Sequence, residues 1–142
     1  MDDRVVERAR GWLGTPYVHQ ASVKGAGTDC LGLIRGIWCE LYGSEPEPAP
    51  MYSPDWGEAG EVEILLNGAT RHLIRLARSE PMQLGQVILF RMRTGAIAKH
   101  LGIVSDASEN TRFIHAYNHH GVIESPLTPP WRNRIVARFR FP

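Results

Sequence analysis

The sequence predicts an α+β fold, with helices in the first half of the chain and antiparallel strands in the second. Two observations support this class. Apolar residues recur with a period near 3.6 in the first half, whereas short apolar runs separated by turn residues fill the second half. A length of 142 residues suits one hydrophobic core, so residues 1–142 are expected to form a single domain.

The first expected helix begins after Asp2 and Asp3, which are suited to capping a helix start. It ends at Gly14, because the following Thr15-Pro16 pair cannot continue it. Residues 17–27 are then expected to form a loop. The apolar stripe of this helix consists of Val5, Val6, Ala9, Trp12 and Leu13.

The second expected helix runs from about Cys30 to Tyr42 and stops at Gly43. Thr28 and Asp29 are helix-starting residues, so Cys30 lies in the first helical turn. The free backbone N–H groups and the helix dipole there favour a thiolate, which predicts a lowered pKa and a nucleophilic sulfur. The alternative is a buried cysteine that acts as a small apolar side chain. The apolar stripe of this helix consists of Leu33, Ile34, Ile37, Trp38 and Leu41.

Residues 44–56 contain four prolines, which predicts an irregular connector on the surface. Helical spacing returns from Glu58 to about Leu76, although Gly68 weakens the prediction of one uninterrupted helix. His72 is expected on its solvent side. The apolar positions of this segment are Val62, Leu65, Leu66, Ala69, Leu73 and Leu76.

The second half of the chain predicts a sheet. Turn residues 118–121 join two of its strands in a hairpin, and Thr128 to Trp131 can form a short helical turn with prolines at its first positions. The expected strands are residues 86–92, 99–104, 112–117, 122–125 and 135–141.

The composition excludes several classes of function. A formal net charge of +1 gives no electrostatic basis for nucleic-acid binding, and no apolar run is long enough for a membrane span. The C-terminal arginines are expected on a solvated strand face or at a protein contact. The chain begins Met-Asp-Asp, without the pattern of a secretory leader, so we expect a protein made in the cytoplasm that needs a carrier to leave it.

The two cysteines, Cys30 and Cys39, are expected to be free thiols. Nine positions along one helix separate them by about 13 Å, which is beyond the reach of a disulfide. No Cys-x-x-Cys pair is present, so cysteine-based metal binding is not expected, and no cofactor is predicted.

A cysteine nucleophile needs a base, and the base needs a third group that fixes its ring. His100 begins one expected strand and His115 lies in the next, so antiparallel pairing can set the two rings side by side near the start of the Cys30 helix. The same pair is compatible with a metal site or with two half-buried structural histidines. His19 lies in the loop that approaches Cys30, whereas His119 and His120 are expected to be exposed in a turn.

Five short segments, taken together in this order, resemble the NlpC family of bacterial cell-wall cysteine peptidases over nearly the whole chain. The short length, the proline-rich insert and the Leu-Thr-Pro-Pro-Trp-Arg ending are most similar to the branch encoded by tailed phages and gene transfer agents. The segments are Gly14-Thr15-Pro16-Tyr17, Asp29-Cys30-Leu31-Gly32-Leu33, Leu84-Gly85-Gln86-Val87-Ile88-Leu89-Phe90, His100-Leu101-Gly102-Ile103-Val104 and Phe113-Ile114-His115-Ala116.

The resemblance implies a papain-like fold and hydrolysis of an amide bond in the peptidoglycan stem peptide, commonly between D-γ-glutamate and the diamino acid. It implies that Cys30 is the nucleophile, His100 the general base and later acid, and His115 the residue that orients His100. It also implies that Tyr17 lines the cleft and that Asp29 can pair with a substrate amine.

Two positions depart from the family pattern. Leu31 follows the cysteine where many members have Ser, and Gln86 stands where many have Asp. The first change is expected to alter the cleft wall and so the choice of bond, whereas the second is expected to affect only a turn.

The phage-like features imply a protein carried in the tail tip of a particle, with tail-hub or baseplate proteins as partners and the bacterial wall, reached in the periplasm, as the place of action. The expected contacts with these partner proteins are the proline-rich segment, which carries Met51, Tyr52 and Trp56, and the C-terminal arginines. Two alternatives remain: a structural tail-tip component whose catalysis is secondary or lost, and a cytoplasmic acyltransferase or deamidase that uses the same triad.

Overall fold

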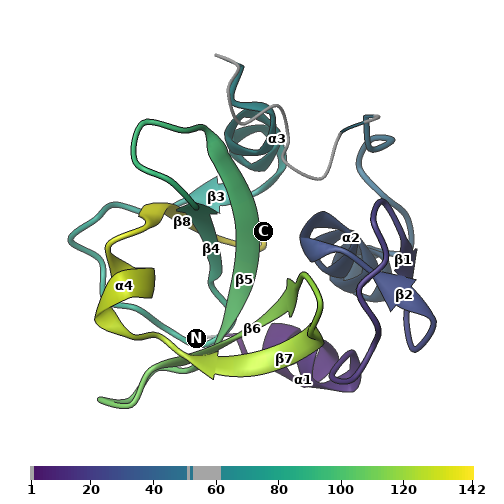
Figure 1. The fold of residues 1–142 in the computed structure, drawn as a ribbon. Helices are drawn as coiled ribbons and strands as arrows, with labels where there is room; N and C mark the ends of the chain where they lie inside the picture. Colours follow the sequence, from purple (N-terminus) through teal and green to yellow (C-terminus); the bar gives the residue numbers. More distant parts are fainter. Residues whose placement is uncertain (1, 51, 53–61) are drawn as a thin grey trace.

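The computed structural model describes residues 2–50, 52 and 62–142. Two helices, α1 (Asp3–Gly11) and α2 (Cys30–Tyr42), lie on one side of a six-stranded antiparallel sheet, and the short helix α4 (Pro129–Arg132) lies on the other (Figure 1). The strand order is β3-β8-β4-β5-β6-β7. The predicted α+β class is confirmed.

Five of the six strands of the sheet occupy segments that the sequence predicts as strands. The turn before β7 closes a tight hairpin in which Tyr117 pairs with Gly121. The strands are β4 (Val87–Arg91), β5 (Ala98–Asp106), β6 (Arg112–Tyr117), β7 (Gly121–Pro126) and β8 (Ile135–Arg140).

Helix α2 has the predicted ends because both are encoded locally. Asp29 caps its start, and Gly43 closes it in the left-handed conformation (φ 92°) that glycine adopts without strain. Helix α1 is shorter than expected and ends at Gly11, which leaves Leu13 40% exposed. The inclusion of Leu13 in the apolar stripe is therefore wrong.

Residues 17–27 are more ordered than the expected loop. They contain a two-stranded hairpin of β1 (Ser22–Val23) and β2 (Gly27–Thr28), which packs on α2. The strands are too short to show a period in the sequence, so pattern analysis missed them. This hairpin leads the chain directly into Cys30.

The third helix is also shorter than predicted. Helix α3 (Ile64–His72) ends where Leu73 turns extended, and β3 (Ile74–Arg75) pairs with β8. The helix therefore does not continue to Leu76, because the open edge of β8 supplies backbone partners for this segment. Val62 lies before the helix and is 65% exposed, and residues 58–61 lie outside the described part of the chain.

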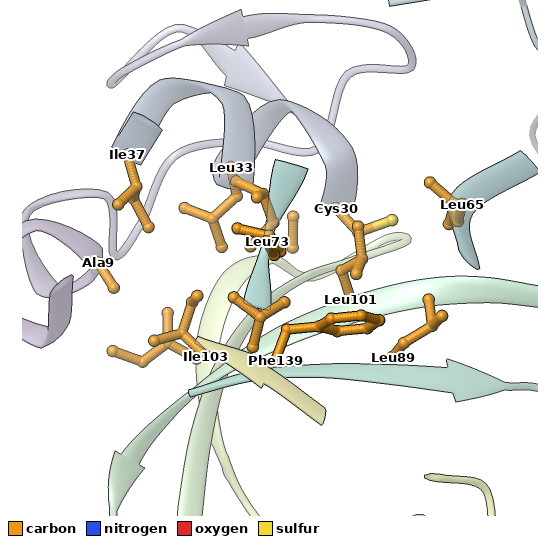
Figure 2. Close-up of a cluster of buried hydrophobic side chains, with 14 of the residues drawn as sticks. Ala9, Cys30, Leu33, Ile37, Leu65, Leu73, Leu89, Leu101, Ile103 and Phe139 are labelled. Carbon is orange, nitrogen blue, oxygen red and sulfur yellow. The ribbon is translucent and has the colours of Figure 1, made fainter. Parts of the chain in front are cut away.

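The main core lies between the helices and the sheet (Figure 2). Leu33 and Ile37 of α2 point at Ile103 and Phe139 of the sheet, and all four are fully buried. A second cluster packs on the opposite face of the sheet, where Trp131 covers buried side chains of β4 and β6. The sheet is thus covered on both faces, which fixes the strands that carry the histidines.

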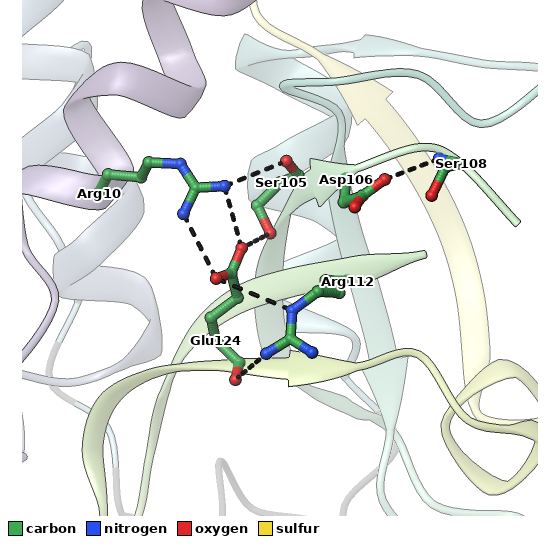
Figure 3. Close-up of polar contacts among 6 residues, drawn as sticks. All are labelled: Arg10, Ser105, Asp106, Ser108, Arg112 and Glu124. Atoms are coloured by element: carbon green, nitrogen blue, oxygen red, sulfur yellow. Dashed lines mark hydrogen bonds and ion pairs between the residues drawn. The ribbon is translucent and has the colours of Figure 1, made fainter. Parts of the chain in front are cut away.

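A polar network ties α1 to the strands at one end of the sheet (Figure 3). The Glu124 carboxylate on β7 forms an ion pair with Arg10 (3.1 Å) and accepts a hydrogen bond from Ser105 on β5 (2.6 Å). Arg112 on β6 donates to the Glu124 carbonyl at 3.1 Å. The network sets the position of β7 relative to β5 and β6.

None of the helices in the described ranges is long and apolar enough to cross a membrane.

Candidate active site

The start of α2 is built around the Asp29 carboxylate, which is only 2% exposed. One oxygen accepts the backbone N–H of Gly32 (2.7 Å), which caps the helix, and the other accepts the N–H of Gln20 (2.8 Å). The second oxygen also accepts the hydroxyl of Tyr52. Asp29, the residue before Cys30, therefore connects the start of α2 with the loop that contains Gln20 and with the proline-rich segment that contains Tyr52.

The Cys30 side chain is 5% exposed and lies against the backbone of β5. Its thiol donates a weak hydrogen bond to the Lys99 carbonyl at 3.6 Å. Both cysteines are free, as predicted. The sulfur thus lies beside the backbone of the residue that precedes His100. Among the described residues, no hydrogen bond joins the Cys30 sulfur to the His100 ring.

The pKa of the Cys30 thiol is raised to about 12, chiefly by burial and then by the charge of Asp29. The backbone N–H groups of Leu101, Leu31 and Cys30 itself act in the opposite direction, but they do not compensate. The expectation of a lowered pKa is therefore wrong for this structure. Burial outweighs the helix terminus, so the resting side chain is a neutral thiol.

The two strand histidines form a direct pair. Nε2 of His100 lies 2.7 Å from Nδ1 of His115, and Nε2 of His115 lies 2.9 Å from the Ser125 hydroxyl. The β5–β6 register pairs Ile103 with Ile114, which sets His100 and His115 on the same face of the sheet. Three side chains from three adjacent strands therefore form one line of hydrogen bonds.

Both imidazoles are buried, and both have lowered pKa values. Burial, followed by the neighbouring His115 and Lys99, holds the pKa of His100 well below its usual range. Burial, followed by His120, lowers the pKa of His115 to about 3. At neutral pH the pair is uncharged, so each imidazole carries one proton and one lone pair, and the direction of the hydrogen bond between them decides which nitrogen of His100 is free to accept a proton.

Aromatic side chains enclose the pair. Trp131 of α4 approaches both imidazoles, with ring centroids 5.7 Å from His100 and 5.3 Å from His115. Phe113 lies 4.2 Å from the His115 ring on the same strand face. These apolar walls exclude water and are the cause of the lowered pKa values.

Tyr17 reaches the same site from the approach loop. It forms a backbone bridge with Thr28, two positions before Cys30, and its side chain is half-buried. Burial, followed by the electrostatic effect of the nearby Cys30 and Asp29, raises the pKa of Tyr17 to about 12. Its hydroxyl therefore stays protonated and can donate a hydrogen bond.

His19 lies beside Asp29, with Nδ1 3.9 Å from the carboxylate and Nε2 2.7 Å from the Tyr52 carbonyl. The other histidines lie elsewhere: His72 contacts Glu47 at 2.8 Å, and His119 and His120 are exposed as predicted. Within the described ranges, no group of three or more His, Cys, Asp or Glu side chains could hold a metal ion.

Comparison with known proteins decides the family of this chain. Residues 14–140 match the sequence profile of the NlpC/P60 family. The chain belongs to the NlpC/P60 family.

Two curated relatives align with most of this NlpC/P60 chain. A probable endopeptidase of Haemophilus influenzae is 25% identical over 134 residues, which cover 94% of this chain and 70% of that protein. The murein DD-endopeptidase MepS/murein LD-carboxypeptidase of Escherichia coli K12 is 26% identical over 132 residues, which cover 92% of this chain and 58% of that protein. The chain therefore spans little more than half of the E. coli relative.

Solved structures share the fold. A lipoprotein-like NLP/P60 protein of Staphylococcus aureus superposes with a TM-score of 0.61 at 22% identity, over 99% of this chain and 42% of that one. The NlpC/p60 domain of the peptidoglycan hydrolase SagA gives a TM-score of 0.58 at 17% identity, over 98% and 97% of the two chains. The predicted papain-like fold is confirmed.

The two departures from the family pattern have different surroundings in this NlpC/P60 chain. Leu31 lines an apolar cavity of about 120 Å³ between α2, residues 46–50 and α3. Gln86 is buried and structural, because its amide donates to the Pro81 carbonyl and accepts from Arg138 at 2.8 Å. Leu31 therefore lines a cavity whose wall does not include Cys30, although Leu31 follows Cys30 directly in the chain, whereas Gln86 holds a turn.

Sequence analysis missed three residues of this site: Tyr52, Ser125 and Trp131. Tyr52 lies in the proline-rich segment, where no pattern indicated a contact with Asp29. Ser125 and Trp131 were assigned only to a strand and a helical turn. Their contacts with His115 depend on strand register and on packing across the sheet, which local spacing does not reveal.

Proposed function

We propose that this chain is a cysteine peptidase that hydrolyses an amide bond in peptidoglycan stem peptides, between D-γ-glutamate and the diamino acid. The observation that carries the proposal is the buried His100–His115 pair, 2.7 Å apart across β5 and β6, together with the contact between the Cys30 thiol and the carbonyl of Lys99, the residue before His100. Membership of the NlpC/P60 family and the endopeptidase names of the curated relatives support the substrate class. Residues 1–142 would act as one catalytic domain.

In the proposed reaction, His100 takes the proton of Cys30 as the sulfur attacks the amide carbonyl. The raised pKa of the thiol and the lowered pKa of the imidazole favour the neutral forms of both groups at rest, so the proton moves from Cys30 to His100 in the course of the reaction. Backbone N–H groups at the start of α2 and the Tyr17 hydroxyl stabilise the oxyanion. His100 then protonates the departing amine, and water cleaves the thioester.

Asp29 is proposed to meet a substrate amine as well as to cap α2. Its carboxylate already accepts two backbone N–H groups and the Tyr52 hydroxyl. An amine would therefore have to replace the Tyr52 hydroxyl, the one side-chain donor among these three. Leu31, which follows Cys30 directly in the chain, would then influence which bond is presented to the sulfur.

The proposed setting is the tail tip of a phage or gene-transfer particle, where tail-hub or baseplate proteins would hold the domain and deliver it to the wall in the periplasm. The resemblance of the proline-rich insert and the chain ending to that branch supports this role. Of the four C-terminal arginines, Arg132, Arg134 and Arg140 are exposed at the proposed contact, whereas the Arg138 guanidinium donates to Gln86 and to the Glu80 carbonyl. Met51 and Trp56 lie outside the described residues. Proteomics of purified particles tests the setting, and absence of the protein from them would refute it.

Digestion of purified sacculi, with mass analysis of the fragments, tests the activity. Cys30→Ser should abolish release of stem-peptide fragments in a folded protein, because a serine in this site lacks the strong sulfur nucleophile. Cys39→Ser is the matched control and should retain activity, since Cys39 lies more than two turns along α2. Fragment release that survives Cys30→Ser would contradict the assignment, and a folded wild type that never releases fragments would favour a structural tail-tip component.

The two histidines are proposed to have different roles, which substitution separates. His100→Ala removes the base and should abolish activity, whereas His115→Asn or His115→Gln keeps a hydrogen-bonding group and should retain much more. Equal and complete loss in folded variants of both positions would contradict this division.

A further inference from the structure

The hydrogen-bonded line of the site does not end at His115. The Ser125 hydroxyl lies 2.9 Å from Nε2 of His115, on the side of the ring opposite His100. The β6–β7 register pairs Phe113 with Ser125 and His115 with Ile123, so Ser125 is a diagonal neighbour of His115 on the same face. The catalytic steps proposed above leave this hydroxyl without a role.

The direction of the His100–His115 hydrogen bond decides whether His100 can act as a base. If His100 carries its proton on Nε2 and donates it to Nδ1 of His115, its own Nδ1 is free to accept the thiol proton. If His115 instead donates from Nδ1, His100 is protonated on Nδ1 and has no lone pair for the thiol. The first arrangement requires His115 to carry its proton on Nε2.

The surroundings of His115 offer that proton few other partners. The residue is fully buried, and Phe113, Tyr117 and Trp131 contact its ring, with centroids 4.2, 5.2 and 5.3 Å away. Aromatic rings are poor acceptors for an in-plane N–H, whereas a hydroxyl oxygen accepts it well. An N–H left without an acceptor at such a buried position is costly.

We propose that Ser125 is a positioning residue that accepts a hydrogen bond from Nε2–H of His115 and thereby keeps His100 in the tautomer that can receive the Cys30 proton. This inference rests on the proposed peptidase function. The Glu124 network described above holds the adjacent residue of β7 to α1, β5 and β6, so the hydroxyl is fixed relative to the imidazole (Figure 3). Ser125 acts through the two histidines and does not touch the reacting atoms.

Kinetics of Ser125→Ala and Ser125→Thr on purified muropeptides test the proposal. The alanine variant should lose about 10- to 100-fold in kcat with KM unchanged within about twofold, as for other residues that orient a functional imidazole. The threonine variant keeps the hydroxyl and should recover most of kcat. Ser108→Ala is the control, because it removes a serine hydroxyl that accepts the N–H of Asn110 in an exposed turn, away from both histidines and from the Glu124 network. A Ser125→Ala enzyme with wild-type kcat, or the same loss in Ser108→Ala, would overturn the proposal.

A second measurement separates this inference from the peptidase assignment. Nitrogen NMR of histidine-labelled protein reports which ring nitrogen of His115 is protonated and needs no turnover, so it can be made in a Cys30→Ser background. We expect His115 to carry its proton on Nε2 in the Cys30→Ser protein and also in the Cys30→Ser/Ser125→Thr protein. In the Cys30→Ser/Ser125→Ala protein we expect a mixture of the two His115 tautomers. If the tautomer responds but the unaltered protein hydrolyses no muropeptide, the peptidase assignment fails and the positioning role stands. If the protein is active and the tautomer is unchanged by Ser125→Ala, the positioning role is refuted.

Discussion

Replacing Asp29 with alanine should strongly destabilise the fold, because this one carboxylate satisfies donors from three segments. It accepts the N–H of Gly32 at the helix start, the N–H of Gln20 in the approach loop and the Tyr52 hydroxyl. Because the side chain is 2% exposed, water cannot replace the lost acceptor without rearrangement. The substitution therefore removes the helix cap at the buried Gly32 N–H and the acceptor of the partly buried Gln20 N–H.

The size of the effect follows from these two losses. Loss of an N-cap costs about 0.5–2 kcal/mol, and loss of the acceptor of a second donor costs about 1–3 kcal/mol, so we expect Asp29→Ala to lower the free energy of unfolding by about 1.5–5 kcal/mol. A chain of 142 residues has an unfolding entropy of about 0.3 kcal/mol per degree, so the melting temperature should fall by roughly 5–17 °C.

Urea unfolding and calorimetry measure this loss directly. Asp29→Asn keeps one acceptor oxygen for Gly32 and should lie between wild type and alanine. Asp106→Ala is the matched control, because Asp106 accepts a single backbone N–H, from Ser108 at 2.8 Å, in an exposed turn and should cost about 0.5 kcal/mol or less. If Asp29→Ala cost no more than Asp106→Ala, the view of Asp29 as the organising cap of the site would be wrong.

Two further predictions concern pH and packing. Burial lowers the pKa of His115 to about 3 in the folded protein, whereas in the unfolded chain its pKa is near 6.5. Between these two pH values only the unfolded chain binds the proton, so acidification favours unfolding. The free energy of unfolding should therefore fall by about 1.4 kcal/mol per pH unit for this group as the pH is lowered through this window. His115→Gln should flatten that acid limb in urea titrations, and identical limbs would contradict the burial of a neutral ring. Gly36→Ala would place a Cβ 2.1 Å from the Trp12 ring and should lower the free energy of unfolding by about 1–3 kcal/mol. The control Gly68→Ala meets nothing closer than 3.7 Å and should raise it by about 0.5–1 kcal/mol. Changes of equal sign in the two variants would refute the packing of α1 on α2.

The sequence by itself determined the elements whose signals are local. The ends of α2 are set by Asp29 and Gly43, whose capping roles depend on neighbours within three or four residues. The hairpin of β6 and β7 is set by the turn between them. Such short-range determinants explain why the fold class and most strands were predicted from the pattern. The sequence only allowed His100 and His115 to lie side by side, and the register of β5 and β6 brings them together.

Only the tertiary structure decided the features that depend on burial and on contacts between distant segments. The Cys30 thiol contacts Lys99, 69 positions away, and its pKa rises because the sheet buries it, which a helix-terminus argument cannot anticipate. Strand β3 forms because β8 offers an open edge, not because two residues carry a strand signal. Ser125 meets His115 through register, since a shift of one residue would turn its hydroxyl to the other face. Local spacing thus specifies which helix or strand carries each candidate side chain, whereas long-range packing specifies the protonation state of that side chain and the residues that it contacts.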